Sequence, residues 1–219
     1  MDSTRIAELL RPFLCGTELA PSVLEQLRLY LDLLLRWNAR MNLTAVRDPE
    51  QIVTRHFGES LFAALVLGRD LAVSRPDFTL ADVGSGAGFP GVPIKLLLPH
   101  SKLTLIESQS KKATFLRETV RTLRLEDAQV FCGRAEEWGT TADAVTLRAV
   151  ERFAYVLPVA AGLARKDGGL CLLVGADQLP EARQLLGADW HWSEPLPVPK
   201  SASRIVAIAR HQPATRHWN

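Results

Sequence analysis

The apolar positions of the first 75 residues recur at helical spacing. Ser22 and Glu25 have the spacing of a capping box and predict the start of a helix. The apolar stripe that follows consists of Leu27, Leu31, Leu34 and Trp37. Asp48 and Pro49 predict the start of another helix, because Pro fits the first helical turn. We therefore expect an N-terminal helical subdomain over residues 1–75.

From residue 76 to residue 219, short apolar runs alternate with helical stretches, as in a parallel sheet covered by helices. The predicted strands cover residues 79–83, 103–107, 128–132, 144–147 and 169–174. Segments 190–198 and 203–209 are also strand-like, and the short connection between them predicts an antiparallel hairpin. The expected fold class is therefore α/β, with a mostly parallel sheet that has an antiparallel hairpin at its C-terminal edge.

Residues 80–91, LADVGSGAGFPG, join the end of the first predicted strand to a glycine-rich turn. Gly84, Gly86 and Gly88 lack side chains where the strand turns into a helix, so the backbone can approach a ligand closely. Glu107 ends the next predicted strand, 21 residues beyond Gly86. This spacing fits one βαβ unit with a carboxylate placed to bind ribose hydroxyls, and it predicts a nucleotide-type cofactor.

The spacing of the glycines favours S-adenosylmethionine (SAM) over a dinucleotide. A GxGxxG fingerprint would have glycine at position 89, whereas this chain has Phe89 and the spacing GxGxG. A SAM site has no pyrophosphate that must approach the helix N-terminus, so it tolerates the bulky side chain. Together with the edge hairpin, the pattern predicts the Rossmann-like fold of SAM-dependent methyltransferases. A nicotinamide-dependent oxidoreductase and a tight turn without a ligand remain open as alternatives.

The charge of the chain is informative in its distribution rather than in its sum. Apolar residues make up 47% and charged residues 23%, which is typical of a globular protein, and the net charge is only +2. Arg117, Arg121 and Arg124 have the spacing of one helical face, which predicts a basic stripe that contacts phosphates. A second basic stretch without acids contains Lys200, Arg204, Arg210 and Arg216. Either patch is also compatible with an ordinary solvated surface.

The cysteines and the N-terminus predict the compartment. Cys15, Cys132 and Cys171 have no CxxC spacing, and we interpret them as buried structural thiols. The first residues lack the apolar core of a signal peptide, and the longest apolar run, 154–164, is too short to span a bilayer. We therefore expect a cytoplasmic protein with no membrane association, no metal and no stable protein partner.

Four motifs occur in one order along the chain: WNARMNLT at 37–44, RHFGES at 55–60, DVGSGAGFPG at 82–91 and LRAV at 147–150. Together they resemble the RsmG (GidB) family over nearly the whole chain, including the N-terminal helices. The resemblance implies an enzyme that transfers methyl from SAM to N7 of a guanine in bacterial 16S rRNA. The expected partner is 16S rRNA or the small ribosomal subunit. A non-catalytic assembly factor that binds SAM and RNA remains open as an alternative.

The cofactor contacts that follow from the glycine turn and the resemblance fall on Gly84, Gly86, Phe89, Glu107, Ser108, Ala135, Glu136 and Arg148. Ala135 and Glu136 follow the third strand, where a methyltransferase usually contacts adenine. The Arg148 guanidinium, after the fourth strand, is suited to a SAM carboxylate, to guanine O6 or to structural pairing with an acid. The chain departs from the family at Glu59, where aspartate is common.

The chemistry of N7 methylation sets few demands on side chains. Guanine N7 carries a lone pair and no proton, so we expect no catalytic general base, and rate enhancement comes from alignment. Methylation of an exocyclic amine commonly uses Asn or Asp before Pro-Pro and an aromatic residue after the fourth strand, where this chain reads TLRAV. Methylation at pyrimidine C5 needs a cysteine nucleophile, and no cysteine here has that place.

Candidate RNA contacts lie in the N-terminal motifs and on the basic stripe: Asn42, Arg47, Arg55, His56, Arg117, Arg121 and Arg124. Residues 1–70 hold eight arginines against nine acids, so the arginines near the first two motifs form a local patch rather than a basic domain. A single His on a helix is more often a structural hydrogen-bonding residue than an RNA or active-site group, and this alternative stays open for His56. Trp37 ends an apolar stripe, and we expect it in the core rather than stacked on a base.

Overall fold

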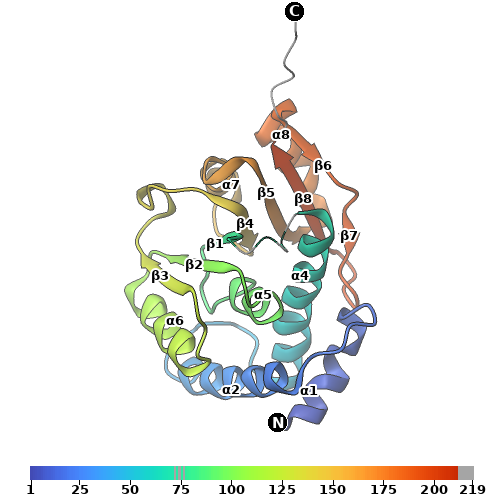
Figure 1. The fold of residues 1–219 in the computed structure, drawn as a ribbon, viewed down its shortest axis with the longest axis vertical. Helices are drawn as coiled ribbons and strands as arrows, with labels where there is room; N and C mark the ends of the chain where they lie inside the picture. Colours follow the sequence, from blue (N-terminus) through green and yellow to red (C-terminus); the bar gives the residue numbers. More distant parts are fainter. Residues whose placement is uncertain (72, 74, 76, 212–219) are drawn as a thin grey trace, which may run out of the picture.

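An eight-stranded sheet forms the centre of the molecule, and helices cover both of its faces (Figure 1). The computed structural model describes residues 1–211 apart from 72, 74 and 76. The strand order is β3-β2-β1-β4-β5-β8-β6, and β7 also pairs with β8. Strands β1 to β5 are parallel, whereas β8 is antiparallel to β5, β6 and β7.

The parallel strands are β1 (Thr79–Val83), β2 (Lys102–Glu107), β3 (Ala128–Cys132), β4 (Ala142–Arg148) and β5 (Ala164–Gly175). The antiparallel strands are β6 (Trp190–Trp192), β7 (Leu196–Pro197) and β8 (Arg204–His211). After β3 the chain returns to the middle of the sheet and places β4 beside β1. The carboxyl ends of β1 and β4 therefore form a topological switch point, where open α/β sheets bind ligands.

One face of the sheet is covered by two layers of helices. Helices α4 (Glu59–Asp70), α5 (Gly91–Leu97) and α6 (Ser110–Thr122) lie next to the strands. Helices α1 (Ser3–Leu10) and α2 (Pro21–Asn38) pack outside them, and α2 contacts both α5 and α6 (Figure 1). The N-terminal helices thereby share one hydrophobic core with the sheet.

A helical segment with one widened stretch connects the N-terminal helices to the sheet. Helix α3 (Pro49–Ile52) continues through a π-helical stretch, Val53–Gly58, into α4. Gly58 is needed for this packing, because a Cβ atom there would lie 2.6 Å from the Phe13 ring. Widened turns of this kind occur often at functional sites.

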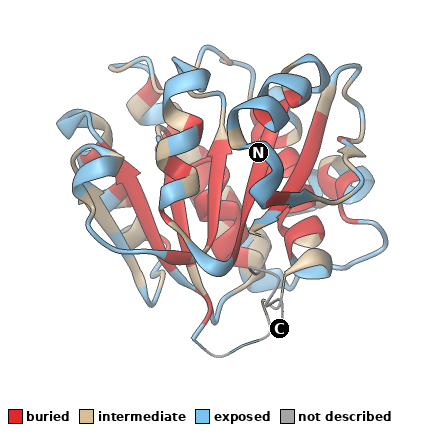
Figure 2. Ribbon diagram, turned by 90° about the horizontal axis from the view of Figure 1, so that it is seen from above, coloured by how far each residue is buried: buried red, intermediate tan, exposed pale blue. Residues whose placement is uncertain are grey.

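The opposite face of the sheet carries α7 (Phe153–Gly162) and α8 (Leu179–Leu186). A 3-10 turn, Ala135–Glu137, follows β3 and contacts α7. The central strands are buried between the helices of the two faces (Figure 2), and a second core cluster lies between the sheet and helices α7 and α8. In the part of the chain that the structure describes, no helix is both long and apolar enough to cross a membrane.

The predicted α/β class, the five parallel strands and the antiparallel edge are confirmed. The segment 190–198 is divided into the short strands β6 and β7, which both pair with β8. The predicted capping box is wrong: α2 begins at Pro21 after Ala20, and no side chain caps it. Pro21 occupies the first helical turn, where its missing N–H is not needed, so the helix begins before Ser22.

The interpretation of all three cysteines as buried is wrong for two of them. Cys171 is buried in β5, whereas Cys15 and Cys132 are exposed. Cys132 ends β3, which is an edge strand, and Cys15 lies in a turn with φ of 49°. The prediction for Trp37 is confirmed, because its ring packs edge-on against Phe115, with 5.7 Å between ring centroids.

Candidate functional site

The glycine turn between β1 and α5 requires its glycines. Gly84, Gly86 and Gly88 have φ angles of 68°, 56° and 88°, which residues with a Cβ atom rarely adopt. The backbone N–H groups of Gly84 and Ser85 both donate to the Ile106 carbonyl at the end of β2. The turn is thereby fixed against the neighbouring strand and leaves its backbone open on the cavity side.

Asp82 connects the turn to the neighbouring strand and helix. Its buried carboxylate accepts hydrogen bonds from Thr146 Oγ1 at 2.6 Å and from the Gly91 N–H at 3.3 Å, so it joins β1, β4 and the start of α5. Burial raises the pKa of Asp82 to about 6, and these hydrogen bonds limit the shift. Asp82 therefore has a structural role in positioning the turn.

Tyr30 holds the same turn from the N-terminal helices. Its hydroxyl donates to the Ala87 carbonyl, and its ring stacks on Phe57 and Phe89. A Cβ atom at Gly88 would lie 2.5 Å from the Tyr30 hydroxyl, so this position has no space for a side chain. Helix α2 is thus part of the support of the site.

Glu107 lies at the end of β2, directly beside the glycine turn. Its Oε2 accepts from the Gly86 N–H at 2.9 Å, and its Oε1 accepts from the Gln109 N–H at 2.8 Å. These two bonds fix the orientation of the carboxylate. Each oxygen keeps a further lone pair, so Glu107 can still accept hydrogen bonds from the hydroxyls of a ligand.

Glu136 and Tyr155 form one side of the cavity rim. Glu136 follows β3, and its Oε1 accepts from the Tyr155 hydroxyl of α7 at 2.6 Å. The Arg152 guanidinium lies 4.7 Å from the centroid of the Tyr155 ring. Because the Tyr155 hydroxyl donates to it, the pKa of the Glu136 carboxyl is lowered.

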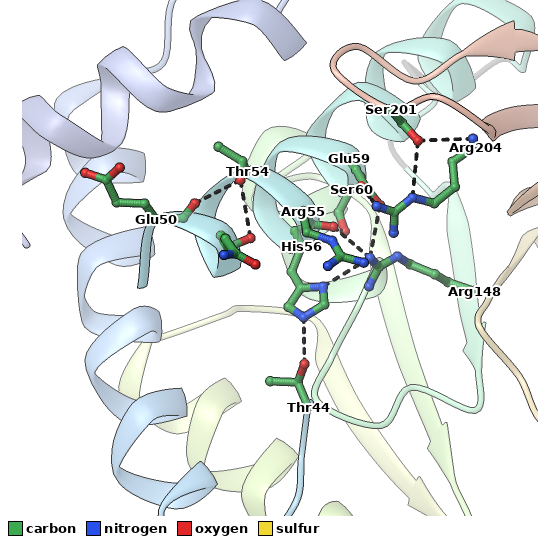
Figure 3. A network of polar contacts seen from close by, with 11 residues as sticks. Thr44, Glu50, Thr54, Arg55, His56, Glu59, Ser60, Arg148, Ser201 and Arg204 are labelled. Atoms are coloured by element: carbon green, nitrogen blue, oxygen red, sulfur yellow. Dashed lines mark hydrogen bonds and ion pairs between the residues drawn. The ribbon is translucent and has the colours of Figure 1, made fainter. Parts of the chain in front are cut away.

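A buried carboxylate joins three distant parts of the chain (Figure 3). Glu59 in α4 accepts from Arg148 at 3.0 Å and from Arg204 at 2.8 Å. The side chains of Glu59 and Arg148 are only 4% and 9% exposed. Burial raises the pKa of Glu59, and the two guanidinium groups oppose this shift. The structural pairing considered for Arg148 is thus present.

His56, in the π-helical stretch, connects Arg148 to the loop after α2. Arg148 Nη2 lies 3.1 Å from His56 Nδ1, and His56 Nε2 lies 2.8 Å from Thr44 Oγ1 (Figure 3). The ring also stacks on Phe89, with 4.9 Å between centroids. Burial and the nearby Arg148 charge lower the pKa of His56 to about 3, so its ring stays neutral at physiological pH.

One cavity of about 480 Å³ is lined by the glycine turn and by Glu107, Glu136, Tyr155, His56 and Arg148. Its first part is formed by the glycine turn, the ends of β2 and β3 and the start of α7. Its second part is formed by Leu43, Thr44, His56 and Arg148. The cavity is large enough for a small cofactor, whose sites commonly have volumes of roughly 300–1,000 Å³. A reacting group that enters the second part would therefore meet a ligand held in the first.

A family model described as rRNA small subunit methyltransferase G matches residues 23–193. The chain belongs to this family. Family membership makes it a SAM-dependent methyltransferase, which agrees with the glycine turn and with Glu107. The resemblance predicted from the four motifs is thus confirmed.

Curated members of the rRNA small subunit methyltransferase G family are similar over most of their length. The Roseiflexus sp. protein is 39% identical over 211 residues, which cover 90% of this chain and 88% of the relative. The Exiguobacterium sp. protein is 37% identical over 199 residues, with coverages of 85% and 79%. The Listeria monocytogenes protein is 33% identical over 213 residues, with coverages of 89% and 86%.

Solved structures support the fold alone. TrmN from Thermus thermophilus aligns with a TM-score of 0.59 at 15% identity and covers 73% of this chain and 53% of its own. A ribosomal protein L11 methylase from Lactobacillus delbrueckii subsp. bulgaricus aligns with a TM-score of 0.57 at 15% identity, with coverages of 71% and 80%. The chain shares their methyltransferase architecture.

All eight residues predicted to contact the cofactor line the cavity of this family member, and so does His56. Arg148 lines it while its Nη2 atom contacts Glu59, His56 and the Arg55 carbonyl. The other candidate RNA residues do not line the cavity. Arg47 donates to Asn42 Oδ1 and to the Asn38 carbonyl, both at 2.7 Å, so these two candidates also brace the loop after α2.

The predicted basic stripe is wrong at one of its three positions. Arg117 and Arg121 are exposed on α6, but the helix ends at Thr122, and Arg124 follows it with φ of 51°. Arg124 therefore does not continue their helical face. In the C-terminal basic stretch, Arg204 is an ion-pair partner of Glu59, and Arg216 lies outside the described residues.

The sequence interpretation missed Thr44 and Tyr155 at the cavity and the role of Arg204. Thr44 belongs to the WNARMNLT motif, which was a signal for the loop but not for this hydroxyl. Arg204 was grouped with surface charges, because no local pattern indicates that a distant acid pairs with it.

Proposed function

We propose that this chain transfers a methyl group from SAM to N7 of a specific guanine in 16S rRNA. The observation that carries the proposal is the cavity lined both by the glycine turn and by Thr44, His56 and Arg148. It offers a cofactor region next to a polar region for a base. Family membership supports the reaction, and the names of the relatives support small-subunit rRNA as substrate.

The cofactor region would hold SAM through backbone and one carboxylate. Gly84, Gly86 and Phe89 would lie along the ligand at the turn, and Glu107 with Ser108 would bind the ribose hydroxyls. Ala135 and Glu136 would contact the adenine. The fit rests on the open glycine backbone and on Glu107, whose orientation is already fixed by two N–H groups. When bound, SAM supplies a methyl group on a positively charged sulfur.

The reaction needs alignment rather than proton transfer. The N7 lone pair forms the new bond to the methyl carbon while the carbon–sulfur bond breaks, and its electron pair stays on sulfur. The positive charge moves from sulfur to the guanine ring, so no proton is released. The neutral His56 ring, hydrogen-bonded at both nitrogens, fits a positioning role and not a base.

Arg148 is proposed as a positioning residue at the reaction end of the sheet. Its Nη2 atom is occupied by Glu59, His56 and the Arg55 carbonyl, and this fixes the second part of the cavity. A SAM carboxylate at Arg148 would have to compete with the buried Glu59 pair.

The RNA would contact the exposed basic residues around the cavity and on α6. We include Asn42, Arg47 and Arg55 in the loop region and Arg117 and Arg121 on α6, with the phosphate backbone as their target. The N-terminal helices, up to about residue 75, would form the subdomain that this enzyme adds to a common methyltransferase fold. The reaction would take place in the cytoplasm, where the ribosomal subunit is.

Expression in a bacterium that lacks its own enzyme of this type tests the proposal. Nucleoside mass spectrometry of its 16S rRNA should show 7-methylguanosine with the wild-type chain and none with the Gly84→Val variant. Absence of the modified nucleoside from cells that contain folded wild-type protein would contradict the proposal. If assembly of the subunit nevertheless improved, the alternative of a non-catalytic assembly factor would be supported.

A further inference from the structure

A chain of three side chains has a fixed hydrogen-bond direction toward the cavity. Arg148 Nη2 contacts His56 Nδ1 at 3.1 Å, and His56 Nε2 contacts Thr44 Oγ1 at 2.8 Å. A guanidinium group can only donate, so His56 Nδ1 accepts. The proton of the neutral ring is therefore assigned to Nε2, which donates to the Thr44 oxygen.

The Thr44 hydroxyl can make one further hydrogen bond, as a donor. Its oxygen accepts from His56 Nε2 and also from the Val46 N–H at 3.1 Å. A hydroxyl oxygen has two lone pairs and one proton. Both lone pairs are used, so the remaining capacity of Thr44 is to donate its proton. Thr44 is one of the residues that line the cavity.

The position of this donor is rigid. Asn38, at the end of α2, accepts from the N–H groups of Leu43 and Thr44 at 2.9 and 3.0 Å. Its own amide donates to the Thr44 carbonyl at 3.0 Å. Asn38 is buried, and the His56 ring is held against Phe89. The backbone of Thr44 is thus held by Asn38, and its hydroxyl is held by His56.

A hydrogen-bond donor at Thr44 matches the acceptors on one edge of guanine. N7 and O6 lie on the same edge of guanine, and both are acceptors, whereas adenine has N7 with an amino donor in place of O6. A base whose N7 faces the cofactor region presents the neighbouring group to the second part of the cavity. A donor there stabilises guanine, and it meets another donor if the base is adenine.

We propose that the Thr44 hydroxyl donates a hydrogen bond to O6 of the target guanine and thereby selects guanine over adenine. The inference rests on the proposed function, since it concerns the same base. His56 is a positioning residue in this scheme, because it sets the direction of the Thr44 hydroxyl. The Arg148 contact keeps the His56 ring in the required tautomer.

The test compares two hydroxyl variants on two substrates. Thr44→Val removes the hydroxyl at nearly constant shape, and Thr44→Ser keeps it. The substrates are small subunits reconstituted with 16S rRNA that carries either guanine or 2-aminopurine at the methylated position. 2-Aminopurine keeps N7 and lacks O6, so it cannot accept the proposed hydrogen bond.

We expect the wild type and Thr44→Ser to prefer guanine over 2-aminopurine in kcat/KM. Thr44→Val should lower kcat/KM for guanine roughly 10-fold and reduce that preference by the same factor. The Kd for SAM, measured by calorimetry, should stay unchanged in both variants. A preference that is equal in wild type and Thr44→Val would overturn the inference. So would a weaker SAM affinity of Thr44→Val, which would assign the hydroxyl to the cofactor instead.

Two further readouts keep the outcome interpretable. If Thr44→Val does not fold, Thr44→Ala replaces it, with the melting temperature as the check on folding. If the wild type methylates neither substrate, the proposed function fails, whereas methylation with an unchanged base preference contradicts only the role of Thr44.

Discussion

The Tyr30 hydroxyl donates a hydrogen bond to the Ala87 carbonyl and so connects helix α2 directly to the glycine turn. This contact explains why the N-terminal helices matter for a site whose chemistry lies at the strand ends. Tyr30 is fully buried, and its ring contacts both Phe57 and Phe89, which also contact each other. The aromatic stack continues to His56, so the cofactor region and the base region share one support.

Tyr30→Phe should destabilise the protein and loosen the turn. The variant keeps the ring but leaves the Ala87 carbonyl without its donor, which costs about 2 kcal/mol for a buried acceptor. We expect a lower free energy of unfolding in urea and a several-fold higher Kd for SAM by calorimetry. Tyr155→Phe removes an exposed hydroxyl and should leave the free energy of unfolding unchanged. Equal stabilities of the two variants would contradict this role of Tyr30.

Gly84→Val should abolish SAM binding. The φ angle of 68° disfavours any residue with a Cβ atom by about 1–2 kcal/mol, and that atom would lie 3.1 Å from Val150. The branched side chain would also occupy the wall of the cavity. The matched control is Gly162→Ala in α7, where a Cβ atom has no neighbour within 4 Å. If calorimetry showed the same SAM affinity for Gly84→Val and Gly162→Ala, the cofactor site would be misplaced.

Asp82 should make stability fall as pH rises between about 4 and 6. Burial raises its pKa from 3.8 to about 6, so the folded state disfavours the ionised carboxylate. The contribution of Asp82 to the unfolding free energy is therefore greatest below pH 4, where the carboxyl is protonated in both states, and it is lost as the pH rises through 6. Asp82→Asn has no charge to develop. The difference in unfolding free energy, wild type minus Asp82→Asn, should therefore fall by about 2 kcal/mol from pH 4 to pH 7.

Urea unfolding at both pH values measures this difference. Other titrating groups affect both proteins equally. Any loss of hydrogen bonds in Asp82→Asn lowers its unfolding free energy by the same amount at both pH values. A pH-independent difference would show that Asp82 has an ordinary pKa in the folded protein.

Arg121→Glu should weaken RNA binding without affecting SAM. Arg121 is exposed on α6, so its substitution leaves the cavity intact. Loss of one phosphate contact should reduce the slope of log K against log salt by about 0.7–0.9. Lys166→Glu makes the same change of charge near the amino end of β5, whereas the cavity lies at the carboxyl ends of the strands. Filter-binding titrations over a salt series should separate the two variants, and identical slopes would remove α6 from the RNA surface.

The sequence predicted the strands better than the helix starts. Short runs rich in apolar residues, such as 79–83 and 128–132, are each followed directly by a glycine, so the strand bounds are local properties. The start of α2 depended on which of two competing local signals prevailed, and Pro21 prevailed over Ser22. Cys132 was misjudged because its burial depends on β3 being an edge strand, which is a property of the whole sheet.

The cofactor half of the site was also readable from local pattern, because positive φ angles demand glycine and the carboxylate follows one βαβ unit later. The other half depends on contacts between distant segments. Glu59 pairs with Arg148 and Arg204 only after α4, β4 and β8 have packed together. The widened helical turn that carries His56 has no sequence signature of its own.

The central claim is tested most directly by incubating the purified protein with methyl-labelled SAM and small ribosomal subunits from a bacterium that lacks this activity. Naked 16S rRNA serves as the parallel substrate, and the labelled nucleosides are identified by mass spectrometry. We expect labelled 7-methylguanosine at a single position of the 16S rRNA. Label on another base or another atom of guanine, or no label in either substrate while SAM binding is intact, would contradict the account.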